Sequence, residues 1–324
     1  MRMLIQPAFL LGLLVLVVAE LVLRCTLSPL QVAAFEYGYH SDSGFQEASD
    51  GMVHLVPALT RDFHAQTFSR ERPPGVFRIF TLGNSVEYWD AFASHILSNT
   101  YPARLATELR QRGIPAESIN LGVTGYGLRR NQVLLRKLLT YQPSLIIIKL
   151  DTTNEGQDEQ NQQRASAFTS CWPKDWLWKS YLVQAGLGFK ENRFLLHTLP
   201  PTLLASTASQ PKKPDVSAPP FNPASQKVLL ECLRMARDQG VPVLLITQAY
   251  AEHTNGRTQL SDRGLNDYVA TLAGPGVSTL SLNQLFASLP LETIFTDHVH
   301  LTRPTHQLVA RAVADAVQKI IAAP

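Results

Sequence analysis

The chain is short of charged residues and has no dense run of basic ones. Of its 324 residues only 17% are charged, and 29 Lys and Arg against 26 Asp and Glu leave a formal net charge of +3. Proteins that bind nucleic acid usually gather Lys and Arg on one stretch or one face. The composition therefore predicts no nucleic-acid partner.

Cysteine is scarce as well. The three cysteines, Cys25, Cys171 and Cys232, lack the close spacing of metal ligands. Cys25 stands at the end of the apolar N-terminal run, which leaves Cys171 and Cys232 as the two that could form a disulfide in the rest of the chain. We predict no cofactor.

A single long apolar run is present, at the N-terminus. It extends over residues 3–19 and continues past Glu20 to Leu23, which approaches the length of about 20 residues that a bilayer requires. A cleaved secretory signal is the alternative, because small residues precede Glu20. We favour an uncleaved membrane anchor over residues 1–25, since Arg24 ends a full-length span. Either interpretation predicts that the globular part lies outside the cytoplasm, in the periplasm or at the cell surface.

Residues 26–75 show little periodicity and are interpreted as a membrane-proximal lead-in. From residue 76 onward, short apolar runs alternate with helical patterns, which is typical of a parallel sheet with crossover helices. Five strands separated by helices predict an α/β fold with a doubly wound, flavodoxin-like sheet within residues 76–324. The expected strands are 76–82, 118–121, 145–150, 241–247 and 277–282, and the expected helices are 102–112, 128–141, 224–239, 263–272 and 305–321.

The alternation is interrupted by an insert at about residues 155–222, which is long for a connection without structure of its own. Its first part contains Trp172, Trp176 and Trp178 and could form an amphipathic helix, whereas its second part has the composition of a flexible linker. A peripheral packing helix followed by a loop is one interpretation. A lid beside the substrate is the other.

The stretch "RIFTLGNSVEYWD" brings Ser85 to the end of the first expected strand. A serine that follows Gly83 and Asn84 is also what an ordinary strand-to-helix turn contains. The choice between a nucleophile and a turn residue depends on whether other catalytic residue types follow the neighbouring strands.

Such residues are present. Gly122 follows the second expected strand and Asn154 the third, and Asp297 and His300 precede the last helix. In an open α/β sheet these positions meet at the carboxyl ends of the strands. A hydroxyl, an imidazole, a carboxylate and oxyanion donors are the groups that acyl transfer requires.

Each of these residues also has a structural interpretation. Gly122 could serve a tight turn, and Asn154 could cap a helix. The histidines around Asp297, namely His298, His300 and His306, raise the alternative of a metal site, which we discount because no second group of ligands has suitable spacing.

Together, the motifs resemble those of the SGNH (GDSL-type) hydrolases. "TLGNS" resembles the first block of that family, "NLGVTGYG" the second, "DTTNE" the third and "DHVHLT" the last, so the likeness runs from about residue 77 to the C-terminus apart from the insert. The resemblance implies that Ser85 is the nucleophile, His300 the base and Asp297 its partner. It also implies oxyanion donors in the backbone N–H groups of Ser85 and Gly122 and in the side chain of Asn154.

Two positions depart from the family pattern. Asn84 stands where the family usually has Asp, and Thr152 where it usually has Gly. The resemblance implies an esterase that removes acyl groups, such as acetyl, from a small molecule or an exported polysaccharide. The alternatives are an O-acyltransferase on such a polysaccharide and a catalytically silent carbohydrate-binding domain.

Overall fold

The computed structural model describes residues 7–26, 37–57, 61–92, 94–169, 180–182, 221–254 and 256–322. The chain divides into two compact units. One comprises Met1–Ser43, Ala58–Arg61 and Asn161–Ala208, and the other comprises Gly44–Pro57, Asp62–Gln160 and Ser209–Pro324.

The first unit contains helix α1 (Pro7–Thr26), which includes residues 7–23 of the apolar N-terminal run. Within this unit the Glu20 carboxylate accepts hydrogen bonds from Arg24, Ser180 and the backbone N–H groups of Tyr181 and Leu182. Among the described residues no helix is long and apolar enough to cross a bilayer, so the structure gives no support to the predicted membrane anchor.

The second unit is built around a five-stranded sheet of β4 (Phe77–Gly83), β5 (Ala116–Gly122), β6 (Leu145–Leu150), β7 (Val243–Thr247) and β10 (Val277–Ser281). The strands lie in the order β10-β7-β6-β4-β5, and every neighbouring pair is parallel. Numbered along the sheet-forming strands, this is the 2-1-3-4-5 order of a flavodoxin-like fold. The predicted fold class is confirmed, and the predicted strand β6 has the observed bounds.

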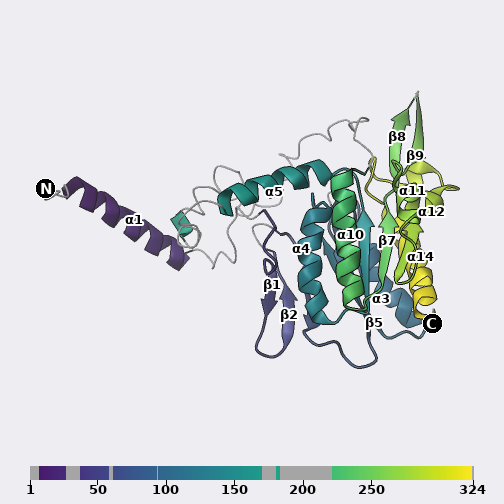
Figure 1. The fold of residues 1–324 in the computed structure, drawn as a ribbon, viewed down its shortest axis with the longest axis horizontal. Helices are drawn as coiled ribbons and strands as arrows, with labels where there is room; N and C mark the ends of the chain where they lie inside the picture. The colour runs from purple at the N-terminus through teal and green to yellow at the C-terminus, as the bar shows by residue number, and fades with distance from the viewer. Residues whose placement is uncertain are drawn as a thin grey trace. The chain divides into compact units, whose positions relative to one another are not determined.

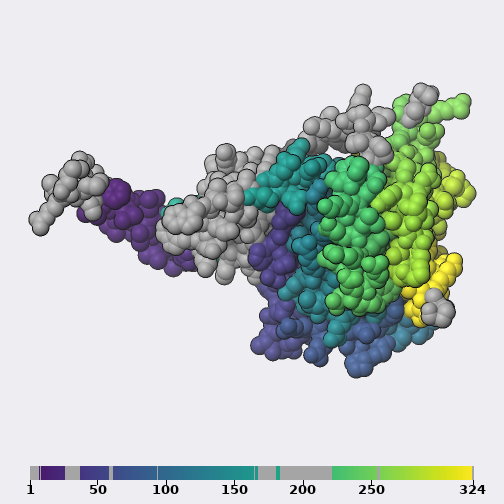
Figure 2. Space-filling model, viewed as in Figure 1, coloured from purple at the N-terminus to yellow at the C-terminus, as the bar shows by residue number. Residues whose placement is uncertain are grey.

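Helices cover both faces of this sheet, because alternate residues of each strand point to opposite sides. Phe80, Leu82 and Ile148 pack in one core with α4 (Leu128–Leu138) and α10 (Pro223–Asp238), whereas Ile79 and Ile147 pack in a second core with α3 (Tyr101–Gln111) and α14 (Arg303–Ala322). Helices α4 and α10 lie side by side over one face (Figure 1). The two helices form much of the surface seen in the space-filling view (Figure 2). The fold is therefore doubly wound.

Shorter elements complete this unit. They are the helices α2 (Ser85–Tyr88), α11 (Leu265–Ala270), α12 (Leu282–Phe286) and α13 (Leu291–Ile294), the 3-10 turns η2 (Leu97–Asn99) and η3 (Leu139–Tyr141), and the antiparallel hairpin of β8 (Tyr250–Thr254) and β9 (Arg257–Ser261). The sequence analysis did not predict the hairpin.

The region interpreted as a lead-in contains a second sheet. Strands β1 (Phe45–Glu47), β2 (Met52–Leu55) and β3 (Gln66–Ser69) pair antiparallel. The rings of Phe68 and Phe80 meet edge to face with their centroids 5.4 Å apart, and Phe45 and Phe68 belong to the same core as Phe80. Part of residues 26–75 therefore packs against the parallel sheet.

Helix α5 (Glu155–Thr169) forms the beginning of the predicted insert. Trp172, Trp176, Trp178 and Cys171, the possible disulfide partner of Cys232, lie outside the described residues, so the interpretation of the insert as a lid stays a prediction. Cys232 lies buried in α10 as a free cysteine, and burial raises the pKa of its thiol.

Candidate active site

Ser85 is the first residue of α2, directly after the turn that ends β4. Asn84 caps this helix: its side-chain oxygen accepts the N–H of Val86 over 3.0 Å, and the Glu87 carboxylate accepts the N–H of Asn84 over 2.8 Å. A Cβ at Gly83 would lie 2.1 Å from the Glu87 carboxylate, so only glycine fits at this position. The Asn-x-x-Glu capping box thus fixes the direction in which Ser85 leaves the strand.

The structure brings Ser85, His300 and Asp297 together as one hydrogen-bonded chain. His300 Nε2 lies 2.9 Å from Ser85 Oγ, and His300 Nδ1 lies 2.6 Å from Asp297 Oδ2. With the proton on Nδ1, the imidazole donates to Asp297 and Nε2 is free to accept the hydroxyl proton of Ser85. Residues separated by 215 positions in the sequence therefore meet in the arrangement that nucleophilic catalysis by serine needs.

A short loop fixes Asp297 and His300 relative to each other. An isolated antiparallel bridge joins Phe295 to Leu301, and the N–H of Thr296 donates to the carbonyl of His300 over 2.8 Å. Asp297 Oδ1 accepts the backbone N–H groups of Val299 and His300 over 2.8 and 2.7 Å. The carboxylate thus fixes the loop with one oxygen and orients the imidazole with the other.

These hydrogen bonds also determine the charge of Asp297. Burial alone would raise the pKa of its carboxyl group, but the hydrogen bonds and the charge of His300 outweigh burial and lower that pKa to about 2. The carboxylate is therefore ionised at neutral pH, as a group that stabilises an imidazolium must be.

The topology of the sheet explains why this site forms here. Ser85 follows β4, and β4 pairs with β6 on one side and with β5 on the other. The connections after β4 and after β6 lead to opposite sides of the sheet, which opens a crevice at the carboxyl ends of these two strands. Ligand sites of doubly wound proteins lie at this switch point.

Gly122 stands at the end of β5, where its N–H donates to Asn120 Oδ1 over 2.9 Å. Its role as an oxyanion donor stays a prediction. A Cβ at this position would lie 2.5 Å from Glu87 Cβ and 2.8 Å from the nitrogen of Tyr88. Gly122 therefore lets the end of β5 approach the helix that carries Ser85.

Asn154 lies between the end of β6 and the start of α5. Its carbonyl accepts the N–H of Asp158 over 2.9 Å, as the residue that begins a helix does. Its role as a donor to the oxyanion stays a prediction, as does that of the Ser85 N–H.

Of the other histidines near Asp297, His306 makes a structural contact through its ring and His298 through its backbone. His306 is buried, its Nδ1 accepts the N–H of Tyr101 over 3.1 Å, and burial lowers its pKa to about 4. The carbonyl of His298 accepts the N–H of Ala251. In the described part of the chain, no group of three or more His, Cys, Asp or Glu side chains could hold a metal ion.

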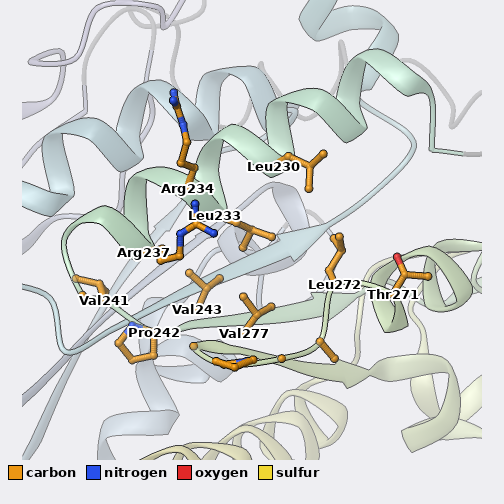
Figure 3. A pocket seen from close by; sticks show the side chains of 15 residues that line it. Leu230, Leu233, Arg234, Arg237, Val241, Pro242, Val243, Thr271, Leu272 and Val277 are labelled. Carbon is orange, nitrogen blue, oxygen red and sulfur yellow. The ribbon is translucent and has the colours of Figure 1, made fainter.

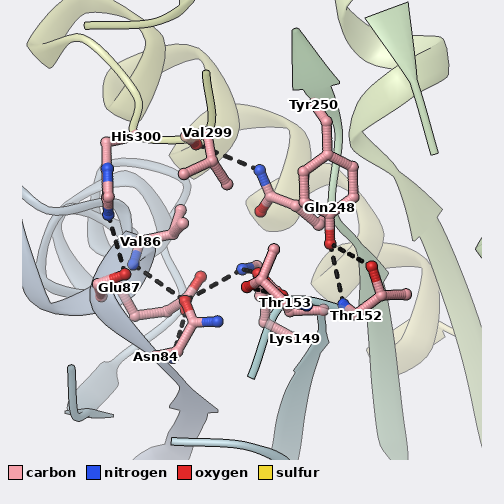
Figure 4. A network of polar contacts seen from close by, with 12 residues as sticks. Asn84, Val86, Glu87, Lys149, Thr152, Thr153, Gln248, Tyr250, Val299 and His300 are labelled. Atoms are coloured by element: carbon pink, nitrogen blue, oxygen red, sulfur yellow. Dashed lines mark hydrogen bonds and ion pairs between the residues drawn. The ribbon is translucent and has the colours of Figure 1, made fainter. Parts of the chain in front are cut away.

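A buried polar network lies beneath the nucleophile, and the sequence analysis missed it. Lys149 Nζ lies 3.2 Å from Asn84 Oδ1 (Figure 4). It also lies 3.0 Å from Asp151 Oδ2, and Tyr101 donates to Glu87 over 3.1 Å. Burial would raise the pKa of Asp151, but the charge of Lys149 and several hydrogen bonds lower it, whereas burial raises the pKa of Glu87. A lone Lys in the apolar run "LIIIKL" was the available signal.

Thr152, the second departure from the family pattern, is held by the β8–β9 hairpin and the loop after it. Its N–H donates to the hydroxyl of Tyr250 over 3.0 Å (Figure 4). Its own hydroxyl accepts from Arg263 over 3.1 Å. Arg263 also pairs with Glu252 over 2.6 Å. Thr152 therefore fixes the hairpin to the loop that follows β6.

A separate hollow lies away from these residues. It is lined by Val243 and Val277, which begin β7 and β10, and by Leu233, Arg234 and Arg237 of α10, together with neighbouring residues (Figure 3). It therefore lies toward the amino ends of these strands, whereas Ser85 follows the carboxyl end of β4. We assign the candidate active site to the triad residues.

No family model matches the sequence, and no characterised protein matches it. Several solved structures are similar in fold. An acetyl xylan esterase shares 15% identity, with 74% of this chain and 99% of that one covered and a TM-score of 0.45. A carbohydrate acetylesterase family member from Sinorhizobium meliloti shares 13% identity, with 76% and 99% covered and a TM-score of 0.43. A GDSL-like lipase from Bacteroides thetaiotaomicron shares 12% identity, with 75% and 89% covered and a TM-score of 0.42.

Two features of this chain's own structure agree with the motifs in its sequence. Its strand order and its Ser85–His300–Asp297 geometry are those that the resemblance to the SGNH hydrolases implies.

Proposed function

We propose that this chain is a serine ester hydrolase of the SGNH type that removes acyl groups, acetyl in particular, from a carbohydrate. The observation that carries the proposal is the unbroken chain of hydrogen bonds from Asp297 through His300 to Ser85. Such a chain activates a hydroxyl that is otherwise a weak nucleophile.

The reaction has two steps. Ser85 Oγ attacks the ester carbonyl while His300 Nε2 takes its proton, and the bond from the carbonyl carbon to the leaving oxygen then breaks as His300 returns the proton to the departing alcohol. Water attacks the acyl-Ser85 intermediate in the same way and releases the acid. Asp297 remains ionised throughout and stabilises the imidazolium of His300.

The carbohydrate substrate and the location outside the cytoplasm are further parts of the proposal. The apolar N-terminal run supports export, whether it is cleaved or retained. An exported chain with these motifs resembles SGNH proteins that act on O-acetylated polysaccharides. Reporter proteins fused to the C-terminus test this part. We expect a reporter that works only outside the cytoplasm to be active, whereas activity of a reporter that works only inside the cytoplasm would reject export.

The experiment that tests the activity uses the purified full-length chain and its Ser85→Ala variant. We expect the wild type to release acetate from 4-nitrophenyl acetate and to be labelled at Ser85 by a fluorophosphonate, and the variant to do neither. Release of 4-nitrophenol that needs an added polysaccharide acceptor, with the acetyl group transferred to that acceptor and no acetate released, would instead indicate an acyltransferase. An unlabelled Ser85 without turnover, in a folded protein, would contradict the proposal.

A further inference from the structure

Two aromatic side chains, Trp89 and Phe92, stand beside the base of the triad, and we name this pair the aromatic wall. The Trp89 ring lies 4.5 Å from the His300 ring and the Phe92 ring lies 5.8 Å from it, centroid to centroid. The two aromatic rings meet edge to face at 5.3 Å. Phe92 is 43% exposed, so the wall presents apolar surface to solvent next to a catalytic group.

Hydrogen bonds fix the wall to the segments that carry the nucleophile and the base. The N–H of Trp89 donates to the carbonyl of Ser85 over 2.8 Å, and the N–H of Phe92 donates to the hydroxyl of Thr296 over 3.1 Å. That hydroxyl in turn donates to the carbonyl of His300. The wall therefore keeps its position relative to the nucleophile and the base, as a binding surface must.

The direction of proton transfer determines which part of an ester meets the wall. His300 Nε2 returns its proton to the oxygen of the leaving alcohol, so the alcohol lies beside the imidazole while the acyl carbon is bonded to Ser85. Trp89 and Phe92 line the imidazole. They therefore face the alcohol portion of the substrate.

The surroundings of the wall favour a sugar as that alcohol. Arg303 lies at the start of α14, is about half exposed (51%) and pairs with the buried Asp90 over 2.6 Å. Its second nitrogen lies 3.3 Å from the hydroxyl of Ser94. A pyranose ring has an apolar face of C–H groups for an aromatic surface and a rim of hydroxyls for such polar groups, whereas an alkyl chain needs an enclosed apolar groove.

We propose, on the basis of the proposed esterase function, that the aromatic wall of Trp89 and Phe92 binds the pyranose ring that carries the ester. The wall thus selects the alcohol portion and leaves the choice of acyl group to other residues. Phe92 is the better probe, because Trp89 lies closer to the imidazole and its replacement would also disturb the base.

The test compares wild type, Phe92→Ala and a control, Leu230→Ala, on three esters. Leu230 is exposed to a similar degree (50%) and lies on α10. The esters are a methyl O-acetyl-xylopyranoside, the butanoyl ester of the same sugar, and ethyl acetate. They vary the alcohol and the acyl group independently.

For Phe92→Ala we expect KM for both sugar esters to rise between about twofold and tenfold with kcat unchanged, which is the range of one aromatic contact. Ethyl acetate turnover and the preference between acetyl and butanoyl should stay as in the wild type, and Leu230→Ala should change nothing. An equal loss on all three esters, or an altered acyl preference, would overturn the assignment of the wall. If the wild type turned over ethyl acetate as well as the sugar esters, the pyranose assignment would be overturned and the esterase proposal would stand. If the wild type turned over none of the three esters and was not labelled by the fluorophosphonate, both would be overturned.

Discussion

The ammonium group of Lys149 lies 3.2 Å from the side-chain oxygen of Asn84, the residue that immediately precedes the nucleophile. Lys149 also pairs with Asp151, and both side chains are buried. A buried ion pair is costly to break, because the remaining charge is left without a partner in a medium of low polarity. The network beneath Ser85 therefore depends on Lys149.

Replacement of Lys149 by Met should lower the free energy of unfolding by about 3 kcal/mol or more. The added change Asp151→Asn should recover part of that loss, because it removes the unpaired carboxylate. Urea unfolding of the two single variants and the double variant at pH 7 measures this coupling. Additive losses would show that the pair does not act as a unit.

The change Asn84→Asp would restore the residue that the family usually has. It would also add a second carboxylate to the buried Lys149–Asp151 pair, so that two carboxylates share one ammonium group, and it would remove the amide donor that Asn84 offers to Asp151. We expect a lower melting temperature, with a greater loss at pH 8 than at pH 5, because protonation relieves the added charge. An unchanged melting temperature at pH 8 would contradict this electrostatic account.

The triad should respond as one unit. Ser85→Ala and His300→Ala should each reduce turnover to background, and the double variant should add little to either loss. Asp297→Asn should reduce kcat by about 10⁴-fold, because an amide can favour the wrong tautomer of His300. Turnover of an acyl ester measures all four variants, with circular dichroism as the check on folding. Multiplicative losses in the double variant would argue against a shared mechanism.

Asn154 and Gly122 should give opposite kinds of loss. Asn154→Ala should lower kcat by about 100 to 1,000-fold with little change in stability, if its amide binds the oxyanion. Gly122→Ala should mainly lower stability, by about 1 to 3 kcal/mol, because its Cβ would collide with Glu87 and Tyr88. Steady-state kinetics and thermal unfolding of both variants separate the two effects. A catalytic loss in a fully stable Gly122→Ala would identify Gly122 as a direct participant.

Glu155 should make stability depend on pH. Its carboxylate accepts hydrogen bonds from the Leu128 N–H and the Ser225 hydroxyl, yet burial raises its pKa from an ordinary 4.5 to about 7. Between these two values the folded chain keeps the proton that the unfolded chain loses, so stability falls as pH rises, by up to about 3 kcal/mol.

Glu155→Gln cannot titrate and should lose this dependence. Unfolding of both proteins in urea at pH 4.5, 5.5, 6.5 and 7.5 provides the comparison. The wild-type stability should fall relative to that of Glu155→Gln across this series. Parallel curves would show that Glu155 does not carry the raised pKa.

The sequence by itself determined the central sheet and predicted the three residues of the candidate triad. Five apolar runs, each long enough for one strand and separated by helical patterns, leave few arrangements other than a doubly wound sheet. Ser85 follows one of these runs directly, and Asp297 and His300 share one short motif. These signals are local, so they can be read along the chain.

Only the tertiary structure decided which groups surround the triad. Lys149 meets Asn84 because β4 and β6 are neighbours in the sheet, and no pattern within either strand states that pairing. Trp89 and Phe92 reach His300 across more than two hundred residues, because the segment after α2 packs beside the loop before α14. Contacts between distant segments depend on packing and strand order, whereas strand and turn patterns depend on near neighbours in the sequence.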